Sequence, residues 1–247
     1  MRQRFSRRIV LAVLLGVLIG STVWVTNMEI LKFRPPATYQ ELAKRMWEHI
    51  LMVGLGELIA IAVGIPLGII VTRPKFKALS PIIIGGANIG QTLPSMAVVA
   101  IIAVVMGQFG FYPAVIALFI YGLLPIIRNS YAGINNIDPS IIESAKGMGM
   151  SRRQILRKIE LPLARPVIMA GIRTSTVINV GTAALAALIA AGGMGMIILA
   201  GLLNNIPLLV LQGAAPTAAL AVTLDVILEG IESLITPRGL RMRKEKG

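Results

Sequence analysis

The fold is decided by apolar stretches such as residues 49–72, HILMVGLGELIAIAVGIPLGIIVT, which hold one carboxylate and no lysine or arginine. A helix rises about 1.5 Å per residue, so a stretch of this length crosses the roughly 30 Å hydrocarbon core of a bilayer. A transmembrane β-barrel would instead show short segments of alternating hydrophobicity. The stretch therefore predicts a membrane-spanning helix.

Similar apolar runs recur along the chain, and the composition agrees with them. Of the 247 residues, 55% are hydrophobic and 14% are charged, which is too little charge to cover the surface of a soluble domain. We therefore predict an all-α polytopic bundle in one transmembrane domain, 1–247, with the first run read as a retained helix and not as a cleaved signal peptide. The six predicted spans are 9–27, 49–72, 80–106, 112–134, 163–190 and 208–236.

Basic residues gather in alternate connections, which orients the spans. Lysines and arginines crowd the N-terminus, 73–79, 135–165 and the C-terminal tail, whereas 107–111 and 191–207 hold no charge. The positive-inside rule places both termini in the cytoplasm. This pattern also explains the net charge of +13 without nucleic acid.

Several classes of chemistry are excluded by what the sequence lacks. There is no cysteine and a single histidine, His49, so neither a disulfide framework nor a zinc site is expected. No G-x-x-x-x-G-K-[ST] loop occurs, and no nucleophile is paired with a base. We expect neither an enzyme nor a cofactor in this chain.

Two polar segments near the spans carry helix signals of their own. Thr38 and Glu41 form a capping box, which predicts a short amphipathic helix on the outer membrane surface. The connection 135–162 is far longer than a hairpin requires. Within it, Asp138-Pro139 opens one short helix, and a capping box of Ser151 and Gln154 opens a second, which ends before the span that Pro162 introduces. We interpret 138–160 as a docking segment; the alternative is a solvated loop.

The same connection carries a specific motif. The order E-S-A, three residues, a glycine, nine residues and I-x-L-P resembles the cytoplasmic E-A-A signature of permease subunits of binding-protein-dependent ABC importers, which would place the chain in the inner membrane of a bacterial cell. Other stretches, QTLP at 91–94, LPIIRN at 124–129 and INVGT at 178–182, look like the branch that imports osmoprotectants. Ser144 stands where the signature has alanine. The matching residues are Glu143, Ser144, Ala145, Gly149, Ile159, Leu161 and Pro162.

This resemblance implies a fold, partners and a task. The fold would be that of a type I ABC importer permease, paired with a second permease subunit that is identical or related. ATP and Mg²⁺ would bind a separate ATP-binding subunit, whose groove would receive the short helix through Glu143, Ala145, Met148 and Gly149. An extracytoplasmic binding protein would deliver glycine betaine, carnitine or choline. The alternative cargo is another small solute, such as an amino acid; a gradient-driven carrier would need an inverted repeat, which we do not find.

Polar residues inside the spans are candidates for the translocation pathway, because such residues usually face the bundle interior or a cavity. Gln91 and Thr92 lie near the middle of the third span, where Gly85-Gly86 and Pro94 weaken the helix. Asn179 and Thr182 lie in the fifth span, and Glu57 in the second is a candidate for attracting a cation. The alternative for all of them is packing between helices.

Two further expectations concern charge and the outer loops. Arg173 and Asp225 lie at similar depths in neighbouring spans and are predicted to form a structural ion pair.

Aromatic residues, 5% of the chain, are too few to cage a quaternary ammonium, so selection would rest with the binding protein. That protein would dock on 107–112 and 191–207.

Overall fold

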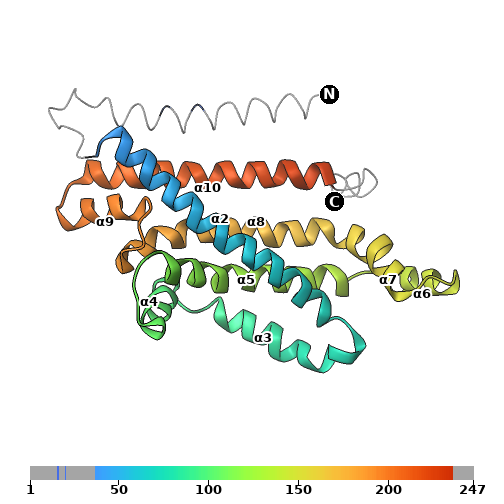
Figure 1. The fold of residues 1–247 in the computed structure, drawn as a ribbon. Helices are drawn as coiled ribbons and strands as arrows, with labels where there is room; N and C mark the ends of the chain where they lie inside the picture. The colour runs from blue at the N-terminus through green and yellow to red at the C-terminus, as the bar shows by residue number, and fades with distance from the viewer. Residues whose placement is uncertain (1–15, 17–19, 21–36, 236–247) are drawn as a thin grey trace. The chain divides into compact units, whose positions relative to one another are not determined.

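The computed structural model describes Gly16, Gly20 and residues 37–235, and the described chain is helical with no strand. The all-α fold class is thus confirmed (Figure 1). The elements are α2 (Tyr39–Ile70), the 3₁₀ helix η2 (Pro74–Leu79), α3 (Ser80–Gly90), α4 (Ser95–Met106), α5 (Phe111–Asn135), α6 (Pro139–Gly147), α7 (Arg152–Ile155), the π-helical turn η3 (Leu156–Glu160), α8 (Leu161–Leu185), the 3₁₀ helix η4 (Ala186–Ile189), α9 (Gly195–Leu203) and α10 (Pro207–Ile235).

Three helical segments in the described range are long and apolar enough to cross a membrane: Tyr39–Ile70, Phe111–Asn135 and Arg152–Ile189. The bent pair Pro74–Gly90 and Ser95–Met106 makes a fourth if it counts as one span. These segments cover the second to fifth predicted spans to within two residues at their ends. α10 matches the predicted sixth span within one residue at each end, while most of the first, 9–27, lies outside the described residues. The count of six stays a prediction.

The predicted short surface helix at 38–48 is wrong, because these residues belong to α2. The Thr38 hydroxyl accepts a hydrogen bond from the Glu41 N–H at 3.3 Å, so the helix start was predicted correctly. From Tyr39 to His49 the chain has no glycine or proline, and nothing in it stops the helix before the apolar run begins. The result is one helix of 32 residues.

The third and fifth predicted spans also differ from the structure. The third is broken, since α3 ends at Gly90 and α4 begins after Pro94, which has no N–H to continue the first helix. The second short helix of the docking segment does not end before Pro162. It continues through η3 into α8 as one helical segment, Arg152–Ile189. The N–H of Leu161 bonds to the carbonyl of Leu156, the wider spacing of a π turn.

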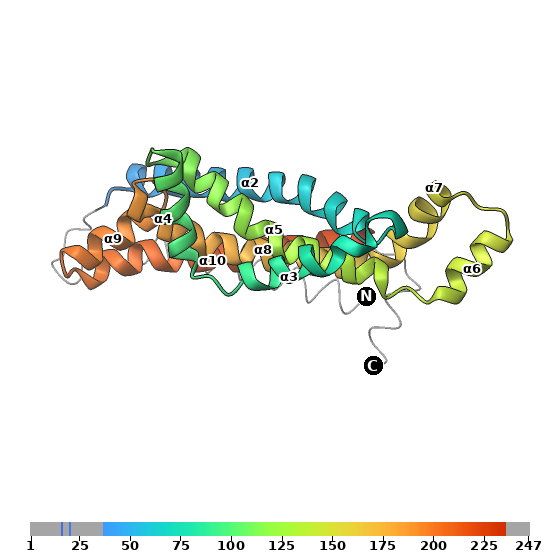
Figure 2. The same ribbon diagram turned by 90° about the horizontal axis from the view of Figure 1, so that it is seen from below.

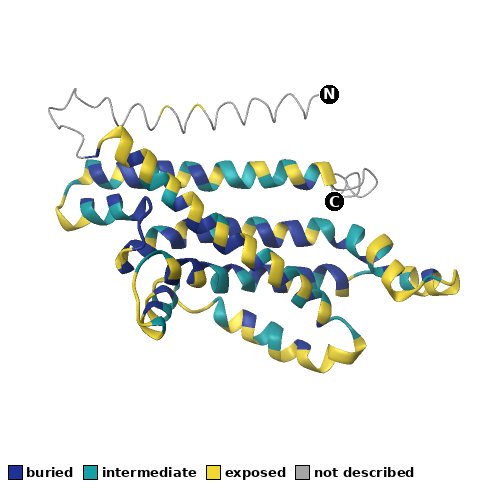
Figure 3. Ribbon diagram, in the orientation of Figure 1, coloured by how far each residue is buried: buried dark blue, intermediate teal, exposed yellow. Residues whose placement is uncertain are grey.

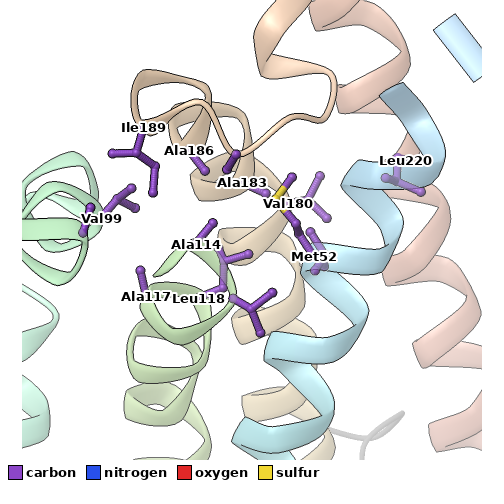
Figure 4. Close-up of a cluster of buried hydrophobic side chains, with 14 residues drawn as sticks. Met52, Val99, Ala114, Ala117, Leu118, Val180, Ala183, Ala186, Ile189 and Leu220 are labelled. Carbon is purple, nitrogen blue, oxygen red and sulfur yellow. The ribbon is translucent and has the colours of Figure 1, made fainter. Parts of the chain in front are cut away.

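The contacts divide the chain into two compact units, whose boundaries fall inside α2, α5, α8 and α10. Among the described residues 37–235, unit 1 comprises 37–59, 93–122 and 176–226. Its core is apolar, and six of the fourteen buried residues in it are alanines, which let the helices approach closely. Figure 4 shows Val99 of α4, Leu118 of α5, Val180 of α8, Met52 of α2 and Leu220 of α10 converging in this core.

Among the described residues, unit 2 comprises 60–92, 123–175 and 227–235. Glycines bring its helices into close contact. A Cβ on Gly68 of α2 would lie 2.5 Å from the Cβ of Ser130 on α5, and one on Gly171 of α8 would lie 2.6 Å from the Cβ of Asn129. Both α2 and α8 therefore pack against α5 through backbone contacts that a side chain would prevent.

Candidate functional site

α6 is a short helix with a strong cap at each end. The Asp138 carboxylate accepts a hydrogen bond from the Ser140 N–H at 2.9 Å, and this bond lowers the pKa of Asp138. At the other end Gly149 has φ +76°. The N–H of Met150 bonds to the carbonyl of Ala145, and the N–H of Gly149 bonds to that of Lys146. These two bonds form a Schellman motif, in which the left-handed position favours glycine.

The surface of α6 is available to a partner. In Figures 1 and 2, α6 and α7 lie beyond the ends of α5 and α8 in unit 2, and Figure 3 shows α6 mostly exposed. Ala145 is buried, whereas Glu143, Ser144 and Gly149 are exposed. Met148 exposes 72% of its surface, so an apolar side chain at the end of α6 is open to a partner.

The other half of the segment joins α6 directly to a long helix. Ser151 and Gln154 form both bonds of the predicted capping box, which opens α7. Ile159 in η3 and Leu161 and Pro162 in α8 are partly buried. The first part of the signature is thus on the exposed helix, and its I-x-L-P part lies at the base of α8.

An ion pair that no sequence pattern indicated lies at the base of α8. Both terminal nitrogens of Arg73, which follows α2, donate to the two carboxylate oxygens of Glu160, at 3.1 Å and 2.5 Å. Glu160 occupies the open position of I-x-L-P and is buried. Because 87 residues separate the partners, no local pattern could have paired them.

The polar candidates of α2 and α8 come together inside unit 1. Asn179 Nδ2 donates to Glu57 Oε2 at 2.8 Å, and both side chains are buried, as is Thr182. Two turns earlier on α2, the buried His49 bonds through Nε2 to the carbonyl of Val180 at 3.0 Å. A carbonyl only accepts, so this nitrogen carries the proton. Several polar contacts thus tie α2 to α8.

The candidates at 91–94 have a different setting. Gln91 is partly buried and Thr92 and Pro94 are exposed, at the break between α3 and α4. The hydroxyl of Thr92 bonds to the carbonyl of Ile89 in its own chain segment. Their assignment to a pathway stays a prediction, as does that of Asn179, Thr182 and Glu57.

Arg173 has acidic partners on α10. Its guanidinium lies 3.4 Å from Glu232 and 3.6 Å from Glu229, both within unit 2. Asp225 precedes Glu229 by one helical turn and therefore lies on the same face of α10. The pairing of Arg173 with Asp225 itself stays a prediction.

The predicted outer loop 191–207 is more structured than its glycines indicated, because it contains α9. Glu48 of α2 accepts a hydrogen bond from the Gly193 N–H at 3.0 Å and pairs with Arg45. The start of this connection is thus held against α2.

An apolar hollow of about 170 Å³ lies in unit 1 between α4 and η4. Every lining side chain is apolar, and Phe109 is the one aromatic residue among them. A quaternary ammonium needs several aromatic faces or a carboxylate, so this hollow does not suit one. The lining residues are Met96, Val99, Ala100, Val104, Phe109, Leu185, Leu188 and Ile189.

Long apolar helices that could cross a membrane, with the exposed and doubly capped α6 between two of them, indicate a multi-pass membrane protein. Residues 64–238 match the family model described as "Binding-protein-dependent transport system inner membrane component". The chain belongs to this family, the membrane permeases of ABC importers.

Curated relatives extend the match over most of the chain. It is 43% identical to the choline transport system permease protein OpuBB of Bacillus subtilis (strain 168), over 83% of this chain and 93% of the relative. It is 44% identical to the carnitine transport permease protein OpuCD of Listeria monocytogenes serotype 1/2a (strain 10403S), over 78% and 86%. Identity to the osmoprotectant import permease protein OsmY of Salmonella typhimurium (strain LT2) is 41%, over 90% and 92%.

A solved structure shares the fold. A chain of the inward-facing MetNI methionine ABC transporter superimposes with a TM-score of 0.65 at 22% identity, over 81% of this chain and 98% of that one. At this identity the likeness concerns the fold alone.

Proposed function

We propose that this chain is the transmembrane subunit through which an ATP-driven importer moves osmoprotectants of the quaternary-amine class. The observation that carries the proposal is the combination of an exposed, capped α6 bearing the importer signature with relatives named for choline, carnitine and osmoprotectant transport. Relatives of this chain named for amino acids would have favoured the alternative cargo.

ATP hydrolysis belongs to a separate subunit in this proposal. The chain has no phosphate-binding loop, so ATP and Mg²⁺ bind the partner. α6 docks in a groove of that subunit, with Met148 as the apolar contact and Glu143 as a polar one. Docking places α6 and both termini in the cytoplasm, as the basic connections require.

Transport follows from conformational coupling and not from covalent chemistry. ATP binding closes the two ATP-binding subunits, and their movement displaces α6 and the helices connected to it. A ligand or partner shifts such an equilibrium only by its differential affinity for the two states. A second permease subunit completes the path, and the break at Gln91–Pro94 contributes to its lining, because free backbone groups at membrane depth are tolerated where they face protein or water.

Solute selection rests with an extracytoplasmic binding protein. The apolar hollow has neither the charge nor the aromatic faces to select a quaternary ammonium. The binding protein docks on the uncharged connections at 107–112 and 191–207, the second of which is formed largely by α9.

The test is uptake by proteoliposomes that contain the complete complex and the binding protein. We expect ATP-dependent uptake of labelled choline, carnitine or glycine betaine, and none of methionine. Met148→Asp should abolish uptake while the isolated ATP-binding subunit keeps its activity. Lys77→Gln, in the exposed η2, is the matched surface control. Uptake that follows an ion gradient without ATP, or that favours an amino acid, would refute the proposal.

A further inference from the structure

The bidentate pair of Arg73 and Glu160 lies where three parts of unit 2 meet. Glu160 is the last residue of η3, between the α6–α7 segment and α8. Arg73 stands three residues beyond α2 and begins η2. The pair therefore joins the end of α2 to the base of the segment that carries the importer signature.

Several features indicate that this pair is specific. Glu160 is the only acid in 151–165, a stretch with five basic residues, and 73–79 contains no acid. Yet both carboxylate oxygens of Glu160 accept hydrogen bonds from Arg73. The two bonds are parallel, the geometry that makes arginine–carboxylate pairs strong. Because Glu160 is buried, leaving its charge without a partner would be costly.

The turn that carries Arg73 is itself held firmly. The Arg73 N–H bonds to the carbonyl of Ile70, and the Ser80 hydroxyl donates to the carbonyl of Val71. A displacement of the Arg73 side chain is thus transmitted to the end of α2.

The backbone on the Glu160 side is less regular. The π turn 156–160 interrupts the α-helical pattern of hydrogen bonds, and Pro162 contributes no N–H. An irregular helical segment of this kind bends more easily than a regular one. Part of a displacement of α6 and α7 would then not reach α8. Glu160 lies at the end of this turn, where α8 begins.

We propose that Arg73 and Glu160 are positioning residues for coupling: the pair makes the end of α2 move together with α8 when the α6–α7 segment is displaced. This inference rests on the proposed function, because it requires a partner that displaces the segment. It adds that the movement enters the bundle through two helices, α8 by continuity of the chain and α2 through the ion pair.

The experiment measures uptake per ATP hydrolysed in proteoliposomes with the complete complex, together with the amount of assembled complex. Glu160→Gln keeps the shape of the side chain and removes its charge. Arg73→Lys keeps the charge and removes the paired hydrogen bonds. In both variants we expect uptake per ATP to fall roughly two- to thirtyfold with assembly retained, the range of effects seen along coupling networks. Lys77→Gln, which removes a charge from the same turn, should leave the ratio unchanged.

A double variant tests whether the two residues act as one unit. The double-mutant cycle compares Arg73→Gln, Glu160→Gln and the variant that carries both substitutions. The double variant should be no worse than the more affected of these two single variants, because one interaction cannot be lost twice. Defects that add, or a normal ratio in assembled Glu160→Gln and Arg73→Lys, would overturn the proposal. Loss of assembly with a normal ratio in the remaining complex would also overturn it, since the pair would then serve folding alone. These contrary outcomes would leave the proposed importer function intact. A wild-type complex without ATP-driven uptake would refute both the importer function and the coupling role of the pair.

Discussion

Asn179 of α8 donates a hydrogen bond to Glu57 of α2 over 2.8 Å, and both side chains are buried. Buried polar groups are costly unless they are hydrogen-bonded. Asn179→Leu removes this donor at similar volume. We expect the variant to be less stable by about 1–3 kcal/mol, which thermal unfolding of the purified permease in detergent measures.

Two comparisons separate this bond from a general effect of substitution. Asn88→Leu, at an exposed position of α3, should change stability by no more than about 0.5 kcal/mol. Glu57→Gln keeps an oxygen that can accept from Asn179, so it should be milder than Asn179→Leu. Equal losses in all three variants would show that the bond contributes nothing specific.

Gly68 of α2 provides a test of helix packing in unit 2. An added Cβ would lie 2.5 Å from the Cβ of Ser130 and 2.8 Å from the carbonyl oxygen of Ile127. Gly68→Leu must therefore push α2 from α5, and overpacking of this kind costs about 1–3 kcal/mol. Thermal unfolding of the purified permease should show the loss.

Gly54 is the matched control on the same helix. A Cβ added there meets no atom within 4 Å. Gly54→Ala should leave stability unchanged or raise it by up to about 1 kcal/mol, because alanine favours the helix. If Gly54→Ala is as harmful as Gly68→Leu, the close contact is not the cause.

The cap at Asp138 gives a prediction with a defined pH dependence. Its pKa in the folded protein lies below the ordinary value of 3.8, because the Ser140 N–H stabilises the charged form. The stabilisation is therefore complete above the ordinary pKa and is lost as the pH falls through the lowered one. At neutral pH, hydrogen exchange of the α6 amides should accelerate in Asp138→Ala and stay slow in Asp138→Asn, which can still cap. Equal exchange in the two variants would contradict this account.

Local signals in the sequence predicted much of this structure. The caps at Thr38, Asp138 and Ser151 join residues within three positions of one another, so their patterns are readable along the chain. Apolar runs of sufficient length likewise gave the long helices, because crossing a bilayer fixes a minimum length.

Other features depend on information that no local pattern holds. Pro162 signals a helix boundary, but a π turn lets the helix continue through it. The contacts of Glu160 with Arg73 and of Asn179 with Glu57 span 87 and 122 residues. The sequence shows that polar and charged residues lie within or beside apolar runs, where burial is costly. It does not show which residues pair with them.

Gly149 allows the shape of α6 to be separated from the contacts that α6 makes. Its φ of +76° is strained for most residues, at about 1–2 kcal/mol, but asparagine tolerates it better than a β-branched side chain does. If glycine is required for the Schellman cap, Gly149→Asn should retain much of the ATP-driven uptake, and Gly149→Val should lose most of it. Hydrogen exchange of the α6 amides should accelerate in the same order. If Gly149 instead leaves room for the partner's surface, both side chains fill that room, and the two variants should lose uptake equally while α6 exchanges slowly in Gly149→Asn. The ratio of uptake between Asn and Val therefore decides whether this position of the signature serves the helix or the interface.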